Sequence, residues 1–157
     1  MTAEADSRSL SYLARRGVSA QWRGFVRALV ETLDANLDPG SRDALLRAVG
    51  ARMAGLAPLP ACGSLAELEQ RMNEALAACD WGWVEVALDQ HDRSLLLAHS
   101  AAPAVAAGTE MDGHWIGAVL EGLYGHWLGA QPGADPTLAP RRTGAGGATL
   151  TLRYGRG

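Results

Sequence analysis

Residues 115–133 read Trp115-Ile-Gly-Ala-Val-Leu-Glu-Gly-Leu-Tyr-Gly-His-Trp-Leu-Gly-Ala-Gln-Pro-Gly133, and this stretch decides the fold. At about 100° per residue, its large apolar side chains share one wide face of a helix. That face consists of Ile116, Val119, Leu120, Leu123 and Trp127. Pro132 and Gly133 end the helix. We therefore predict a long central helix around which the other elements pack.

A second stripe, made of small residues, runs beside this apolar face. It consists of Ala118, Gly122, Gly125 and Gly129. Each interior glycine costs a helix about 1 kcal/mol relative to alanine, so three cost about 3 kcal/mol. Close approach of another backbone offsets such a cost, because a side chain would not fit there. We predict tight contact along this stripe, with Trp127 beside it, either within the fold or at an oligomer interface.

Helical periodicity continues upstream of the central helix. Ser19 is a suitable N-cap for a helix whose apolar positions run from Trp22 to Leu37, and Ser41 is a suitable cap for the next. Asp38-Pro39-Gly40 separates these two helices. The capping box Ser64-Leu-Ala-Glu67 starts a third helix.

The period changes to two around the central helix. Residues 81–88 alternate between apolar and other side chains, and residues 94–99 form the returning strand of a hairpin. A second hairpin with a glycine turn is predicted over residues 141–154. The fold class is therefore α+β with an antiparallel sheet. We expect a flexible N-terminal arm over residues 1–18 and a single domain over residues 19–157.

Composition limits the classes of function. The chain has 157 residues and a net charge of −3, which is no footprint for nucleic acid. The N-terminus lacks the pattern of a secretory signal, and Glu121 and His126 interrupt the central helix, which is too short to be a membrane span. Two cysteines, Cys62 and Cys79, are expected to be buried free thiols. We expect a cytoplasmic protein.

The residues predict no catalytic apparatus. The four histidines lack the i, i+4 spacing of a helical zinc site, and no nucleophile elbow is present. We expect neither a metal nor a cofactor, and no enzyme activity. Glu121 within the central helix is either an interhelical hydrogen-bonding group or a buried acid with a function. The five tryptophans belong either to the core or to a surface that stacks on sugars.

Several motifs together carry a family resemblance. They are Leu45-Leu-Arg-Ala-Val-Gly-Ala-Arg-Met-Ala54, Leu59-Pro-Ala-Cys62, Trp81-Gly-Trp-Val84, Val119-Leu-Glu-Gly-Leu-Tyr-Gly-His-Trp-Leu128 and Gln131-Pro-Gly-Ala134. With these spacings, the region from about Trp22 to Ala134 resembles cellulose biosynthesis accessory protein D, the D subunit of the bacterial cellulose synthase complex. The first twenty residues do not match the family pattern, and the C-terminal hairpin is similar only in character.

The resemblance implies a non-catalytic scaffold for cellulose secretion, which organises nascent glucan export and assembly into crystalline cellulose. It implies a homo-octamer, a tetramer of dimers, that works with a proline-rich secretion partner, the cellulose synthase complex and nascent β-1,4-glucan. It also implies a place in the cytoplasm near the inner membrane, with the periplasm as the alternative.

Sugar contacts of this family lie near the N-terminus, where this sequence departs from the pattern. From position and chemistry we assign glucan contact to Arg15, Arg16, Ser19, Gln21 and Trp22. Two other classes of function stay open. A regulatory domain would use the small-residue stripe as the wall of a small-molecule pocket, and a glycoside-active enzyme would need two carboxylates about 5–10 Å apart.

Overall fold

The computed structural model describes residues 2–105, 109–146 and 149–156. Five helices and four strands follow one another in this part of the chain. They are α1 (Thr2–Arg16), α2 (Ala20–Asn36), α3 (Pro39–Leu56), α4 (Leu65–Ala78), β1 (Trp83–Leu88), β2 (Leu95–Ser100), α5 (Thr109–Gly129), β3 (Arg141–Gly146) and β4 (Thr149–Tyr154). The predicted α+β class is confirmed, with helices first, then a hairpin, the long central helix α5 and a second hairpin.

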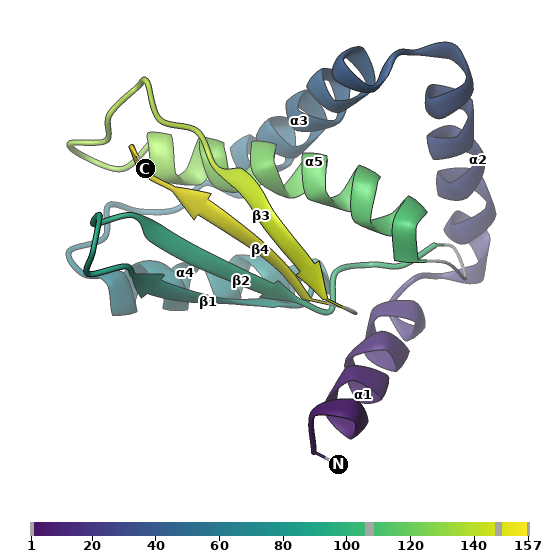
Figure 1. Ribbon diagram of the computed structural model, residues 1–157, viewed down its shortest axis with the longest axis horizontal. Helices are drawn as coiled ribbons and strands as arrows, with labels where there is room; N and C mark the ends of the chain where they lie inside the picture. The colour runs from purple at the N-terminus through teal and green to yellow at the C-terminus, as the bar shows by residue number, and fades with distance from the viewer. Residues whose placement is uncertain (1, 106–108, 147–148, 157) are drawn as a thin grey trace.

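The body of the molecule is a sheet backed by helices (Figure 1). The strand order is β1-β2-β4-β3 and every pairing is antiparallel. Both predicted hairpins are present, and pairing of β2 with β4 joins them into one sheet. Leu97 and Leu152 are opposite each other on these two strands and both are buried. The two leucines belong to one hydrophobic core with buried residues of α3, α4 and α5, such as Ala54, Met72 and Leu120.

Helices α1 and α2 extend away from this body (Figure 1). The segment for which we predict a flexible arm contains the helix α1, and the chain turns at residues 17–19 before α2 begins. On α2, Val30 is buried and belongs to the core, whereas most of the helix is exposed. We call α1 and α2 together the helical arm.

The helix starts follow local capping chemistry. The Ser19 and Ser64 side chains accept hydrogen bonds from the Gln21 and Glu67 backbone N–H groups at 3.1 Å, so both predicted N-caps are confirmed. The predicted cap at Ser41 is wrong. Asp38 caps α3 and accepts the Ser41 N–H at 3.0 Å. Pro39 suits the first helical turn, where its missing N–H would have no partner in any case.

The cysteines differ from the expectation in one respect. Both are free thiols, as predicted. Cys62 is half-buried, but Cys79 is exposed, because α4 ends at Ala78 and Cys79 forms its C-cap. The apolar periodicity of α4 continues only to Leu76, which is buried.

Candidate functional site: the helical arm and the outer helical surface

The five residues to which we assign glucan contact lie together where α1 ends and α2 begins. We call this group, Arg15, Arg16, Ser19, Gln21 and Trp22, the arm corner. All five are exposed. The Ser19 hydroxyl already serves as the cap of α2.

Arg23 holds the arm corner in shape. Its guanidinium donates to the Arg15 and Val18 backbone carbonyl oxygens at 3.0 and 2.9 Å. Trp22 is 56% exposed and its ring stands edge-on to Phe25, with centroids 5.8 Å apart. The arrangement presents one large aromatic face and several polar groups to solvent, which is a chemistry that suits a sugar ring.

The apolar arc of α2 has a buried half and an exposed half. Projected at about 100° per residue, its apolar side chains from Trp22 to Leu37 cover about 140°, which is wider than one packing partner requires. Val26, Val30 and Leu33 are half-buried or buried against the body. Phe25 and Leu29 are exposed.

Helix α3 divides in the same way. Leu46, Gly50 and Ala54 are buried and α3 packs on α5, whereas Leu45, Val49 and Leu56 share another side of α3 and are exposed. We call Phe25, Leu29, Leu45, Val49 and Leu56 the outer helical surface. The sequence analysis counts these residues among the packed apolar positions of their helices. For Phe25 and Leu29, the width of the apolar arc of α2 is the signal that indicates a second, exposed side.

The small-residue stripe of α5 meets different neighbours along its length. At Gly122, an added Cβ would lie 1.9 Å from the Arg47 carbonyl oxygen of α3. Ala118 is fully buried, and at Gly125 an added Cβ would lie 3.2 Å from the Pro140 ring. Gly129 has open space around it. The closest approach on the stripe is therefore made within the chain.

Gly50 of α3 is the counterpart that sequence reasoning misses. A Cβ at this position would lie 1.8 Å from the Val119 carbonyl oxygen of α5. Gly50 and Gly122 thus let α3 and α5 approach each other backbone to backbone. Trp127 is buried beside this contact, and its indole N–H donates to the Ala57 carbonyl oxygen at 2.9 Å.

Glu121 is the centre of a series of linked ion pairs. It is 8% exposed. Its Oε1 forms ion pairs with Arg142 Nε at 2.9 Å and with Arg47 Nε at 3.7 Å. The Arg142 N–H does not point at this oxygen, so the contact is an ion pair and not a hydrogen bond. Arg142 also pairs with Asp43 of α3 at 3.1 Å, and Arg42 joins Asp43 to Asp34 of α2. The buried acid therefore ties α5 to β3 and α3, and the series continues to the arm.

His99 and Tyr124 form a buried polar pair. His99 Nε2 lies 2.7 Å from the Trp81 carbonyl oxygen, which can only accept, so this nitrogen carries the proton. Nδ1 is then free to accept from the Tyr124 hydroxyl. Burial lowers the pKa of His99 to about 4 and raises the pKa of Tyr124 well above its ordinary value. A neutral histidine held in this way is a structural group.

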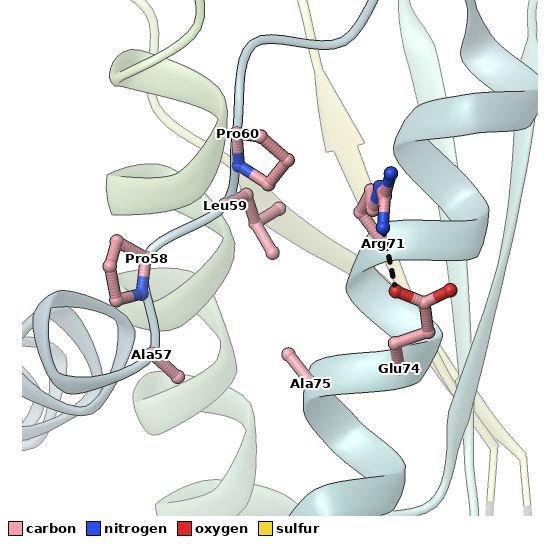
Figure 2. Close-up of a pocket in the computed structure, with 7 residues that line it drawn as sticks. All are labelled: Ala57, Pro58, Leu59, Pro60, Arg71, Glu74 and Ala75. Atoms are coloured by element: carbon pink, nitrogen blue, oxygen red, sulfur yellow. Dashed lines mark hydrogen bonds and ion pairs between the residues drawn. The ribbon is translucent and has the colours of Figure 1, made fainter.

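One open pocket lies away from the stripe, between the segment Ala57–Pro60 and α4 (Figure 2). Pro58, Leu59 and Pro60 form one wall, and Arg71, Glu74 and Ala75 of α4 form the other. Arg71 pairs with Glu74 across 3.2 Å, so its charge is already compensated. None of the residues that line this pocket belongs to the small-residue stripe of α5. It is therefore not the stripe-walled pocket that a regulatory small-molecule domain would use.

The described residues hold neither a metal-binding cluster nor a membrane-spanning helix. In this part of the chain, no three histidine, cysteine or acidic side chains gather around a common point. Among the described helices, none has the length and apolar character to span a bilayer. His91 and His126 are exposed.

Similarity to known proteins places the chain in a family. The family model for the D subunit of cellulose synthase matches residues 8–155. The cellulose synthase operon protein D of Komagataeibacter xylinus is 37% identical over 110 residues, which is 70% of each chain. The protein of the same name from Komagataeibacter sucrofermentans matches to the same extent. On this match across most of its length, the chain belongs to the family of cellulose synthase D subunits.

Proposed function

We propose that this protein is a non-catalytic scaffold of a bacterial cellulose secretion system, and that it organises nascent glucan into crystalline cellulose. The observation that carries the proposal is the outer helical surface. Large exposed apolar side chains that share one side of a helix mark interaction surfaces. The family membership supplies the cellulose system as the context.

Assembly of copies through the outer helical surface is the mechanism that we propose. Phe25 and Val49 are exposed and do not belong to the hydrophobic core of the chain, so only a partner molecule can bury them. Closed symmetry gives finite rings of identical copies. The octamer, a tetramer of dimers, follows from the family resemblance, as do the proline-rich partner, the cellulose synthase complex and a cytoplasmic place near the inner membrane.

The assembly predicts a measurable mass. Eight copies of a 16.5 kDa chain give about 130 kDa. Light scattering should give this mass for the unmodified protein. Val49→Arg should lower the mass to dimers or monomers, because a desolvated unpaired charge is costly at an interface. Circular dichroism should be unchanged, since Val49 is exposed in one copy.

The matched control is Ala87→Arg. Ala87 is exposed on β1, away from the outer helical surface, so this variant should keep the mass of the unmodified protein. A monomeric unmodified protein at micromolar concentration would contradict the octamer. Equal dissociation in both variants would contradict the assignment of the surface.

The arm corner predicts a glucan contact through Trp22. Cellohexaose should perturb tryptophan fluorescence, and Trp22→Ala should weaken binding about fivefold or more, since an aromatic contact is worth about 1 kcal/mol beyond its area. The sugar should be recovered without new reducing ends, as expected for a non-catalytic protein. The control is Trp83→Ala, which removes an exposed tryptophan from the sheet. Weaker binding in Trp83→Ala, but not in Trp22→Ala, would contradict the assignment.

A further inference from the structure

The strand β1 lies at one edge of the sheet. It is the first strand in the order β1-β2-β4-β3, so only β2 pairs with it. Unpaired N–H and C=O groups along such an edge are a template for another strand. In an antiparallel pair these groups alternate, so every second residue of β1 directs its backbone groups away from β2. Val84 and Val86 are two such residues, because their N–H groups donate to side chains of α4 and not to β2.

Two side chains of α4 occupy this edge. Asn73 Nδ2 donates to the Val84 carbonyl oxygen at 2.9 Å, and Asn73 Oδ1 accepts from the Val84 N–H at 2.7 Å. Glu69 Oε2 accepts from the Val86 N–H at 2.7 Å. The Asn73 amide thus makes the pair of bonds that a residue of an adjacent antiparallel strand would make.

The spacing of the two side chains matches the strand. Residues 69 and 73 are one helical turn apart, about 6 Å along α4. Val84 and Val86 are two residues apart in a strand, about 6.7 Å. The helix runs opposite to the strand, so Asn73 meets Val84 and Glu69 meets Val86. One turn before Glu69 on α4 is Leu65, whose side chain has no hydrogen-bonding group. It therefore cannot bond to Leu88, the residue of β1 two positions after Val86, and both leucines are exposed.

We propose that Asn73 and Glu69 close the β1 edge against strand pairing with a second copy of this chain. A second copy is the relevant partner, because an antiparallel edge can pair with its own two-fold mate. Such pairing would have to displace both bonds to Val84 and the bond to Val86. The inference stands on β1 and α4 alone and does not depend on the scaffold role.

An open-edge variant, Asn73→Leu with Glu69→Leu, tests the proposal. In dilute solution, hydrogen exchange at the Val84 and Val86 amides should speed up about tenfold, since each loses a hydrogen-bond partner. At high protein concentration, light scattering should show a mass above that of the unmodified protein. The same two amides should then regain protection, because a second β1 edge covers them.

The control separates edge opening from added apolar surface. Gln70→Leu with Glu74→Leu adds two leucines to α4 at positions that are exposed. It should leave the mass and the exchange of Val84 and Val86 unchanged. The conservative variant Glu69→Gln keeps an acceptor and should also behave as the unmodified protein.

Two results would overturn the proposal. One is a folded open-edge variant whose mass at high protein concentration equals that of the unmodified protein. The other is equal association of the control variant. If the double variant does not fold, Glu69→Leu alone decides the matter. It leaves Asn73 in place and should speed up exchange at Val86 but not at Val84, and an unchanged Val86 amide would contradict the role of Glu69.

Discussion

Gly50→Ala and Gly122→Ala should each destabilise the protein by about 3 kcal/mol or more, at the upper end of overpacking costs. An alanine Cβ at Gly50 would lie 1.8 Å from the Val119 carbonyl oxygen. At Gly122 it would lie 1.9 Å from the Arg47 carbonyl oxygen. Both obstacles are backbone atoms, which cannot rotate away as a side chain can. The two helices would have to separate.

The size of the effect follows from the place of this contact in the fold. Helices α3 and α5 pack along much of their length, with Leu46 and Ala54 of α3 buried beside Gly50. Separating the helices opens this apolar contact as well. Small domains are stable by only about 5–15 kcal/mol. Either substitution should therefore remove a large share of the free energy of unfolding, although alanine favours helix over glycine by about 1 kcal/mol.

Urea denaturation at one fixed protein concentration measures this effect. Gly129→Ala is the matched control on α5, because an added Cβ there meets nothing within 4 Å. It should change the free energy of unfolding by no more than about 1 kcal/mol. Gly125→Leu is intermediate, since its side chain meets the Pro140 ring rather than backbone. Equal stability of Gly122→Ala and Gly129→Ala would contradict the proposed close approach.

Local patterns predict the elements of this fold, and long-range contacts decide their arrangement. Helix α5 follows from its apolar period, the first hairpin follows from the alternation over residues 81–88, and the second follows from its glycine turn. The pairing of β2 with β4 does not, because it joins residues from separate hairpins. The start of α3 is misassigned because Asp38-Pro39-Gly40 fits a break as well as a cap followed by a proline in the first turn.

The candidate site shows the same limit. The stripe on α5 indicates close approach, yet its partner Gly50 belongs to a distant helix and only the structure pairs them. A signal was present on α3, where Gly50 and Ala54 are small residues one turn apart. Periodicity also cannot separate an apolar side chain that packs inside one copy from one that awaits a partner. Val30 and Leu29 are neighbours in sequence, and only the first is buried.

The buried histidine gives a prediction for the dependence of stability on pH. His99 is fully buried, and burial lowers its pKa to about 4 from an ordinary value of 6.5. Between these two pH values the unfolded chain binds a proton that the folded chain does not. Acid therefore favours unfolding in this window. The stabilisation is complete above pH 6.5 and is lost as the pH falls through about 4.

The shift also sets the size of the effect. One pKa unit corresponds to about 1.4 kcal/mol, so the loss across the window is about 3 kcal/mol. Hydrogen bonds lower the pKa of Asp38, Asp89, Asp92 and Asp135 below its ordinary value of 3.8, so these four groups act below this window. The pKa of Asp92, for example, is held at about 2 by its bond to Arg153 and by the backbone N–H of Ser94. The fall between pH 6.5 and 4 is therefore assigned to His99.

Urea denaturation at a series of pH values tests this assignment. The unmodified protein should lose about 3 kcal/mol between pH 6.5 and 4. His99→Gln removes the titrating group, so its free energy of unfolding should be lower at pH 7 but nearly constant across the window. His126→Gln is the control, because His126 is exposed, and it should keep the full slope. A slope in His99→Gln equal to that of the unmodified protein would show that another group titrates. In that case the pKa of His99 would be the same in the folded and the unfolded chain, and its buried bonds to Tyr124 and Trp81 would tolerate the protonated ring.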